Sequence, residues 1–389
     1  MYPSLYHFFY DVFGLDITGL KAIKSFGFFV AIGFITGNAL LIAELKRMEK
    51  AGIFHPQMRK VLVGKPISPI DLFLNALLGF FLGYKIVFAF LHSEVFADFP
   101  TFLFSSEGNS IAGIIGAGIM GYWRYAEVKK TVLPTPKEEE QAFHAYQHAG
   151  PITGIAAIFG FIGARLFAYL EDPGPISELF TDPFRGFTVY GGMICGVLAG
   201  SIYLYKNKLS LLRFYDAVSP ALILSHGVGR IGCQTAGDGD WGIVNNHPKP
   251  SFLPDWLWGY RYPNNVNMEG IPMENCIYND DYCTILREPV YPTPIYETIM
   301  CIMIFGVLWY YRKKIIIPGI LFFMYIAFNG IERLLIEQIR VNVPYKLAGL
   351  EFTQAELIAA LLIITGIAGI VILLKRNKNL LKDASNGNP

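Results

Sequence analysis

Long apolar stretches recur along the whole chain and are separated by shorter polar segments. A helix needs about 20 mostly apolar residues to cross the hydrocarbon core of a bilayer, and helices are one of two structures whose backbone groups can be satisfied there. The pattern predicts about nine such helices, at residues 25–43, 71–91, 110–125, 150–170, 188–205, 216–232, 293–311, 317–337 and 355–374. We therefore expect an all-α polytopic integral membrane protein, with residues 1–389 in a single membrane domain.

The composition supports a membrane protein. Hydrophobic residues make up 53% of the 389 residues and charged residues only 16%, whereas soluble chains carry about 25% charged residues. This is too little charge to cover the surface of a soluble protein of this length. The formal net charge of +1 provides no basic field, so we expect no nucleic-acid partner.

The basic residues predict the orientation of the chain. Cytoplasmic loops carry an excess of Lys and Arg. Basic residues follow the first, third, fifth, seventh and ninth apolar segments, whereas acids are frequent in the alternate loops; the basic residues include Lys46, Arg47, Lys129, Lys130, Lys206, Arg312, Lys313, Lys375 and Arg376. We expect the N-terminus outside the membrane and the C-terminus in the cytoplasm.

Two parts of the chain resemble each other. Residues 77–96 resemble residues 157–176, and each stretch is followed by a glycine-rich segment, at 110–121 and 188–200. Lys85 in the first stretch aligns with Arg165 in the second. A duplicated helical hairpin explains this, but so does a shared composition, because glycine serves close packing between membrane helices in general.

The cysteines give no metal-binding spacing. Cys195 and Cys301 lie in apolar runs, as packing residues do. Cys276 and Cys283 share a polar loop and could form a disulfide in an oxidising compartment. There is no C-x-x-C pair and no Cys/His spacing typical of a metal site, so we expect no metal and no soluble cofactor.

Ionisable residues inside membrane helices are costly and often functional. Arg165 lies in the fourth apolar segment, and His226 and Arg230 lie one helical turn apart in the sixth. An arginine lined by glycines suits phosphate binding through its fixed charge and forked donors. His226 could equally hydrogen-bond between two helices.

The eighth apolar segment ends in a polar stripe. Asn329, Arg333, Glu337 and Arg340 follow one another at spacings of four, four and three residues, which place them on one helix face. We expect this face to line a cavity or another helix. Two alternatives are that Arg333 and Glu337 merely pair, and that Arg340 extends to the membrane surface.

Two loop motifs add further candidate residues for the functional site. The segment GRIGCQTAGDGDWG at 229–242 contains Cys233, Asp238 and Asp240 among glycines, which allow a backbone to approach a ligand closely; an ordinary turn would explain the acids but not the preceding arginine. The segment YPTPIYE at 291–297 contains Tyr296 and Glu297. These two residues could instead be an interfacial anchor and a favourable charge at a helix start.

Together these segments resemble the prolipoprotein diacylglyceryl transferase family. GRIGCQTAGDGDWG looks like that family's GRxGNFxNxExxG signature, TVYGGMICG like its HGG or YGG segment, YPTPIYE like its HPSQLYE, and RLLIEQIR keeps its R-x3-E-x2-R spacing. GARLFAYL and SFGFFVAIGF resemble two of its membrane helices. The order of all six is preserved between about residues 25 and 374.

The resemblance implies an enzyme of the bacterial cytoplasmic (inner) membrane that transfers the diacylglyceryl group of phosphatidylglycerol to the lipobox cysteine of a prolipoprotein. A thioether forms and glycerol phosphate leaves. The implied partners are this phospholipid, the prolipoprotein signal peptide and the membrane, and we expect a monomer. The catalytic candidates are Tyr190, Arg230, Asp238, Asp240, Arg333 and Glu337. The candidates for substrate binding are Arg165, Gly191, Gly192, His226, Cys233, Tyr296, Glu297, Asn329 and Arg340.

The chemistry of these residues agrees with that reaction. Fixed positive charge belongs where a phosphate leaving group gains negative charge, which suits Arg230 and Arg333. The nucleophile is the substrate thiol, whose proton needs a base. The position of Tyr190 is often His in the family, and tyrosine is a poor base near neutral pH. Glu337, Asp238 and His226 are the alternatives.

The chain departs from the family pattern in several places. Cys233 replaces the signature Asn, Asp238 or Asp240 replaces its Glu, and Asn329 replaces a Tyr. Relative to the seven-helix family core, we expect an extra helical hairpin at 70–127 and an extracytoplasmic loop insertion at 232–291. These departures leave two other hypotheses open: a paralogue that uses the same phospholipid with a different acceptor, and a lipid binder or transporter without enzymatic activity.

Overall fold

The structure is a computed structural model that describes residues 1–96, 99–175, 186–274, 276, 278, 282–342, 345–347 and 350–378. In these residues, nine helices have 18 residues or more: α2 (Ser25–Lys50), α3 (Pro69–Leu91), α5 (Ser110–Lys129), α6 (Ala149–Glu171), α8 (Val189–Lys206), α9 (Leu211–Ala236), α11 (Thr293–Tyr311), α12 (Ile320–Glu337) and α13 (Gln354–Arg376). Each overlaps one of the predicted apolar segments, although α8 and α12 begin one and three residues later than predicted. Five of the described helices, α2, α3, α6, α11 and α13, are long and apolar enough to cross a membrane. The helical membrane protein is confirmed, and nine crossings stay a prediction.

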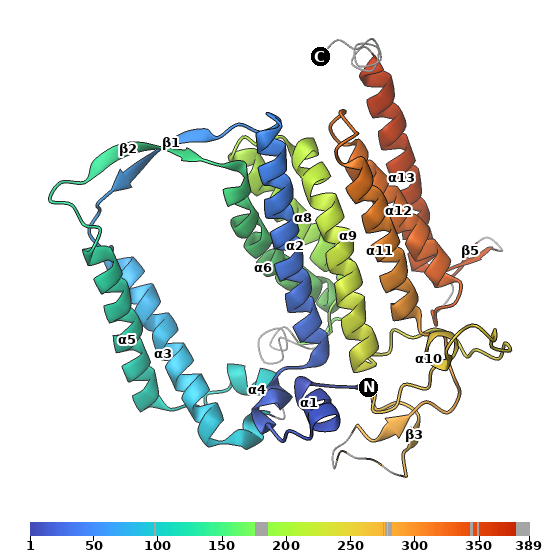
Figure 1. Ribbon diagram of the computed structural model, residues 1–389. Coiled ribbons are helices and arrows are strands. Elements are labelled where there is room, and N and C mark those ends of the chain that lie inside the picture. The colour runs from blue at the N-terminus through green and yellow to red at the C-terminus, as the bar shows by residue number, and fades with distance from the viewer. Residues whose placement is uncertain are drawn as a thin grey trace.

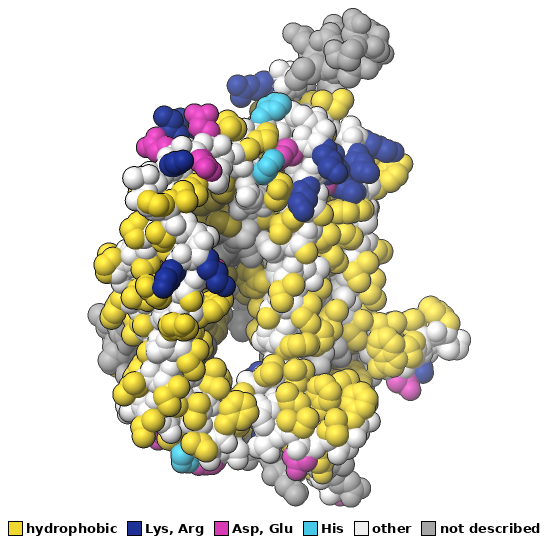
Figure 2. Space-filling view, turned by 60° about the vertical axis from the view of Figure 1, so that its left-hand side comes forward, with side chains coloured by type: hydrophobic (Ala, Val, Ile, Leu, Met, Phe, Trp, Pro, Cys, Tyr) yellow, Lys and Arg dark blue, Asp and Glu magenta, His cyan; other side chains and the backbone are white. Residues whose placement is uncertain are grey.

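The long helices form two bodies (Figure 1). Helix α9 lies inside a bundle, where it packs against α2, α11 and α12, while α6 pairs with α8 and α12 with α13. Helices α3 and α5 pack against each other as a separate hairpin. The space-filling view shows an opening between this hairpin and the bundle (Figure 2).

Apolar side chains cover the outside of the helices. Phe90 is 76% exposed and Ile111 72% exposed, and hydrophobic side chains fill most of the face seen in Figure 2, with Lys and Arg mostly towards its upper end and some farther down on the left. Water-exposed surfaces do not carry such continuous apolar cover. The long helices are therefore suited to a lipid environment.

Short strands were missed by the all-α prediction. Strands β1 (Gln57–Val63) and β2 (Lys137–Phe143) form an antiparallel ribbon that joins the hairpin to the bundle (Figure 1). Lys60 lies opposite Glu140 in its register, an opposite-charge pairing that favours a strand pair. The other described strands are two- or three-residue pieces: β3 (Ile271–Pro272), β4 (Thr284–Ile285), β5 (Tyr345–Leu347) and β6 (Leu350–Phe352).

The end of the bundle opposite this ribbon carries the short helices and the long loop. It holds α1 (Leu5–Phe13), α4 (Phe99–Phe104) and α10 (Asp255–Trp258) (Figure 1). The remaining short elements are the 3-10 helices η1 (Thr18–Ala22), η2 (Ser93–Phe96) and η3 (Ala145–His148). The amino group of Met1 donates to the carbonyl oxygen of Pro263 at 2.7 Å, and Cys276 and Cys283 form a disulfide. The hydrogen bond ties the N-terminal segment to the loop, and the disulfide closes a short stretch within the loop.

The α3–α5 and α6–α8 pairs share details of construction. The residue before α5, Asn109, donates its backbone N–H to the carbonyl of Tyr84 at 2.8 Å, and the residue before α8, Thr188, does the same to Ala164 at 3.0 Å. Tyr84 and Ala164 directly precede the aligned residues Lys85 and Arg165. Glycine contacts also correspond, since Gly83 lies against Ala112 and Gly163 against Gly191.

Candidate active site

The motif at 229–242 begins inside α9 and ends in a turn that leads to α11 and α12. Gly237 ends the helix with a positive φ of 65°, and Gly239 has a φ of 92°, a backbone region that favours glycine. The chain then turns back, so that the N–H of Gly242 donates to Tyr291 O and that of Ile243 to Ile339 O, both at 2.8 Å. Three segments distant in sequence thus meet at one end of the bundle.

Four charged residues from these segments form an ion cluster. Arg230 pairs with both Asp240 and Glu297. Arg340 pairs with Asp240 and lies with its Nη1 atom 3.3 Å from Glu297 Oε1. Glu297 is only 1% exposed. The other three side chains are partly buried, and two positive and two negative charges compensate each other here, as charges withdrawn from water require.

Arg340 is not on the helix face that the spacing predicted. Helix α12 ends at Glu337, and Arg340 follows in a bridge to Gly242. The ion pair with Asp240 and the hydrogen bond from Ile243 to Ile339 draw this segment towards the loop after α9. The predicted stripe therefore stops at Glu337.

Other predicted residues surround the ion cluster. His226 and Arg230 lie on one face of α9 as expected, and Nε of Arg230 donates to Nε2 of His226 at 3.3 Å. The Sγ atom of Cys233 lies 3.8 Å from Nη1 of Arg230. The hydroxyl of Thr293 donates to the carbonyl oxygen of Asp240 at 2.5 Å. The replaced signature residue, Cys233, is thus in direct contact with the signature arginine.

The two aspartates of the loop differ in their electrostatics. Burial raises the pKa of Asp238, and the neighbouring charge of Asp240 raises it further. Burial also opposes ionisation of Asp240, but the guanidinium groups of Arg230 and Arg340 outweigh it and hold the pKa of Asp240 below its ordinary value. Asp240 is therefore a fixed anion, and Asp238 is the better proton acceptor of the two.

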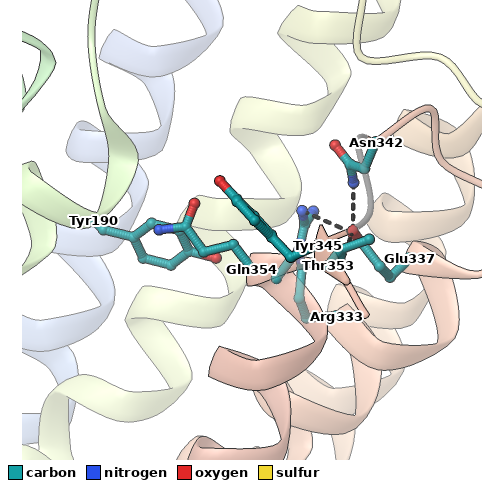
Figure 3. Close-up of a pocket in the computed structure, with 8 residues that line it drawn as sticks. Tyr190, Arg333, Glu337, Asn342, Tyr345, Thr353 and Gln354 are labelled. Atoms are coloured by element: carbon teal, nitrogen blue, oxygen red, sulfur yellow. Dashed lines mark hydrogen bonds and ion pairs between the residues drawn. The ribbon is translucent and has the colours of Figure 1, made fainter. Parts of the chain in front are cut away.

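A cavity of about 250 Å³ opens beside the ion cluster, between α8, α12, β5 and the start of α13 (Figure 3). Tyr190 lines it from α8 and Arg333 and Glu337 from α12; the other lining residues are Asn342, Tyr345, Thr353, Gln354 and Ala355. In Figure 3, Tyr190 lies on one side of the cavity and Arg333 with Glu337 on the other. Three of the predicted catalytic residues thus share one cavity.

The carboxylate of Glu337 is held from several sides. Its Oε2 atom lies 3.0 Å from Nη2 of Arg333, and its Oε1 atom accepts from the hydroxyl of Thr353 at 2.6 Å and from the amide of Asn342. Arg333 Nε, by contrast, is buried and has no hydrogen-bond partner among the described residues. A buried donor without a partner is uncommon, and next to a cavity it suits an anionic ligand.

Several of the residues predicted to bind substrate do not line the cavity and make structural contacts elsewhere. Gly191 packs against Gly163 and Phe167 of α6, and Gly192 against Gly160 and Ala164, so these glycines bring α8 close to α6. The hydroxyl of Tyr296 donates to Leu257 O at 2.6 Å and holds the loop near α10. Arg165 in α6 and Asn329 in α12 are not among the residues that line the cavity.

The sequence analysis did not predict the cavity residues at the start of α13, which include Thr353. Thr353 and Glu356 form a capping box at the start of that helix. The spacing T-x-x-E before an apolar run is a signal for such a helix start and could have located Thr353. Asn342 gives no comparable signal, because its contact with Glu337 depends on the course of the chain after α12.

The sequence of the chain matches a known protein family. The family model described as prolipoprotein diacylglyceryl transferase matches residues 110–372, which is more than half of the chain. The chain belongs to the prolipoprotein diacylglyceryl transferase family. The matched range contains every residue of the ion cluster and of the cavity, whereas α2 and α3 precede it.

Individual members of the prolipoprotein diacylglyceryl transferase family are similar over most of their length. A phosphatidylglycerol–prolipoprotein diacylglyceryl transferase of Staphylococcus aureus (strain bovine RF122 / ET3-1) is 29% identical over 225 residues, which are 56% of this chain and 70% of the relative. The corresponding protein of Staphylococcus carnosus (strain TM300) is 29% identical over 243 residues, 60% of this chain and 78% of the relative.

Proposed function

We propose that this protein is a phosphatidylglycerol–prolipoprotein diacylglyceryl transferase. The substrate cysteine sulfur attacks the glycerol carbon that carries the phosphate of phosphatidylglycerol. A carbon–sulfur bond forms, the carbon–oxygen bond to phosphate breaks with its electron pair on oxygen, and glycerol phosphate leaves. The thiol proton passes to a base. The observation that carries this assignment is the cavity in which Tyr190, Arg333 and Glu337 meet, in a chain of this family.

Arg333 is the proposed ligand of the donor phosphate. Its side chain lines the cavity; its buried Nε atom has no hydrogen-bond partner among the described residues, while Nη2 is fixed by Glu337. The phosphate gains negative charge as the carbon–oxygen bond breaks, and a guanidinium held in place stabilises that charge more than it stabilises the bound substrate. Tyr190, on the opposite side of the cavity, would donate a hydrogen bond to the phosphate or to an ester.

Glu337 is the proposed acceptor of the thiol proton. Its carboxylate belongs to the cavity wall and is oriented by Thr353 and Asn342, and a base must lie within hydrogen-bond reach of the proton that it removes. Asp238, with its raised pKa, is the second candidate. It lies at the ion cluster and is not among the residues that line the cavity.

The ion cluster has a different proposed role. The charges of Arg230 and Arg340 are compensated by Asp240 and Glu297, so an incoming phosphate would have to displace a carboxylate to pair with them. We propose two roles for Arg230. Its positive charge stabilises the phosphate from a distance, without direct contact, and its ion pair with Asp240 holds the loop after α9 in place. Arg340 joins the same loop to the end of α12, next to Glu337.

We further propose the arrangement in the membrane. All nine long helices cross it, the ribbon end of the bundle is cytoplasmic, and the α10 end is outside in the bacterial inner membrane. Basic residues at the ends of α11 and α13, such as Arg312, Lys313 and Arg376, support this orientation. The cavity then lies in the outer half, where a signal peptide presents its cysteine. A monomer suffices, since one chain supplies all the proposed residues.

The domain organisation is part of the proposal. Residues 1–389 form one membrane domain, residues 70–127 are an extra hairpin, and residues 232–291 include an extracytoplasmic insertion. The hydrogen bonds of Asn109 and Thr188 at the same position of two helix pairs support an origin of the hairpin by duplication of α6–α8. The disulfide between Cys276 and Cys283 supports an oxidising location for the insertion.

A transfer assay tests the function. Purified protein is incubated with phosphatidylglycerol and a lipobox peptide with a single cysteine, and the peptide is analysed by mass spectrometry. A mass gain of one diacylglyceryl group on the thiol, absent for a peptide with Ser in place of Cys, is the expected result. Folded protein that binds phosphatidylglycerol and leaves the peptide unmodified would refute the proposed acceptor and favour a different one.

A further inference from the structure

A second group of polar side chains lies at the junction of α9, α11 and α12, next to the ion cluster. His226 comes from α9, Cys301 from α11 and Glu332 from α12, and one potential metal-ligand atom of each lies within 4.8 Å of the other two. The three helices pack against one another in pairs. Each helix thus contributes one donor to a single point, which we call the three-helix donor group.

The surrounding helices bury two members of this group, Cys301 and Glu332, and leave His226 partly exposed. Cys301 is 0% exposed and Glu332 is 4% exposed. Gly227 lets α9 approach α11 closely, because a Cβ atom at this position would lie 2.9 Å from Cβ of Cys301. Donors fixed in this way by helix packing are typical of sites built inside helical bundles.

Glu332 lacks the partner that a buried carboxylate requires. Glu332 is 4% exposed, and among the described residues its carboxylate has no hydrogen bond or ion pair, whereas the buried Glu297 and Glu337 each pair with an arginine. A carboxyl group buried without a partner in a membrane helix either keeps a proton or gains a cation, because an unpaired buried charge is costly. A cation bound between Glu332, Cys301 and His226 would supply the missing partner.

The donor set selects the kind of cation. One imidazole nitrogen, one thiol sulfur and one carboxylate oxygen are ligands that Zn²⁺ accepts, and three protein ligands leave a fourth position for water. Ca²⁺ and Mg²⁺ prefer oxygen ligands throughout. We propose that His226, Cys301 and Glu332 bind a thiophilic divalent cation such as Zn²⁺, and that this cation inhibits the enzyme. Cys301 loses its thiol proton to solvent on binding, as metal-bound cysteines do.

Inhibition follows from the contact between His226 and Arg230. Nε2 of His226 accepts the hydrogen bond from Nε of Arg230, so this nitrogen carries no proton. A cation on Nε2 would occupy the same lone pair, and a cation on Nδ1 would leave the ring proton on Nε2. Either way the acceptor is lost and Arg230 faces an added positive charge. The ion cluster beside the catalytic cavity would therefore be disturbed, an effect that rests on the function proposed above.

Cobalt provides a direct probe of the site. Co²⁺ is added to the purified full-length protein in detergent, without substrate, and the absorption band of a cobalt–thiolate bond is recorded. We expect one equivalent of Co²⁺ to bind, Zn²⁺ to displace it, and Cys301→Ser to abolish the band. Cys195→Ser is the matched control, because Cys195 lies in α8 outside the group, and it should keep the band. Folded wild-type protein without a band, or a band that survives Cys301→Ser, would overturn the proposal.

The transfer assay provides the second measurement. Zn²⁺ should inhibit the wild-type enzyme reversibly, with recovery on addition of a chelator, and Glu332→Gln should raise the inhibitory Zn²⁺ concentration by about tenfold or more. Zn²⁺ bound by the peptide thiol affects both enzymes equally and cancels in this comparison. Equal Zn²⁺ sensitivity of the two enzymes would contradict the inhibition. If no transfer occurs even without metal, the proposed function fails, while the cobalt band still decides the site.

Discussion

The Nη2 atom of Arg333 lies 3.0 Å from the Oε2 atom of Glu337 one helical turn further along α12. This pairing was one of the simpler explanations for the two residues. The structure adds that both line a cavity with Tyr190 opposite, and that Nε of Arg333 has no hydrogen-bond partner among the described residues. The pair therefore combines an oriented carboxylate with a guanidinium whose Nε lacks a hydrogen-bond partner among the described residues.

Arg333→Ala is expected to abolish most of the transfer activity. Removal of one preorganised group that stabilises developing charge lowers kcat by about 100- to 1,000-fold, and we expect kcat to fall far more than the KM for phosphatidylglycerol rises. The matched control is Arg124→Ala, which removes an arginine that pairs with Asp71 at 2.8 Å in the α3–α5 hairpin. Arg124→Ala should keep near-normal activity. Equal losses in both variants would show a general folding defect.

Tyr190 offers a test of its hydroxyl group. Tyr190→Phe keeps the ring that lines the cavity and removes one hydrogen-bond donor, and a neutral hydrogen bond contributes about 1 kcal/mol. We expect a fall in kcat/KM of about five- to tenfold. Tyr190→His restores a donor and adds a base that titrates near neutral pH, so its activity should exceed that of Tyr190→Phe. Activity of Tyr190→Phe equal to that of wild type would exclude a role for the hydroxyl.

Asp240 should make stability depend on pH in the acid range. Its folded-state pKa lies below its ordinary value, which is near 4, so its ion pairs stabilise the fold fully above the ordinary value. This contribution is lost as the pH falls through the lowered folded pKa. We expect Asp240→Asn to destabilise the protein by roughly 2 kcal/mol near neutral pH, less than the loss of a partner costs in a fully buried pair, because the Asp240 side chain is 29% exposed.

Thermal unfolding in detergent between about pH 3 and pH 7 checks this prediction. The difference in Tm between wild type and Asp240→Asn should shrink towards the acid end. A difference that stays constant over the whole range would show that Asp240 acts through packing or hydrogen bonds alone.

The helices could be predicted because each requires only a local run of apolar residues. The runs at 25–43 and 355–374, for example, lie within α2 and α13, and α2 continues past its run to Lys50. The β1–β2 ribbon was missed, because β1 is a short run of mixed residues, β2 is mostly charged, and each strand is paired only with a partner about 80 residues away in sequence, such as Lys60 with Glu140.

The candidate site was predictable where its residues belong to one motif. The spacing of four residues alone predicts that His226 and Arg230 lie on one helix face, and the hydrogen bond between them is present. Arg340 was placed on the wrong surface, because the spacing rule assumes a helix that in fact ends at Glu337. The three-helix donor group has no signal in sequence spacing at all, since Cys301 and Glu332 are brought to His226 only by helix packing.

Gly163 connects helix packing with the position of Tyr190. A Cβ atom at Gly163 would lie against Gly191 O and 2.5 Å from Cβ of Cys195, so Gly163→Ala must push α8 away from α6. Such overpacking costs typically about 1–3 kcal/mol. Tyr190 directly precedes Gly191 and lines the cavity, so we expect a lower Tm and a lower kcat together. Gly154→Ala in the same helix is the control, because nothing lies within 4 Å of its Cβ position. That substitution should raise stability slightly, by up to about 1 kcal/mol, through helix propensity. If both variants behave alike in Tm and kcat, close packing of α6 and α8 does not position Tyr190.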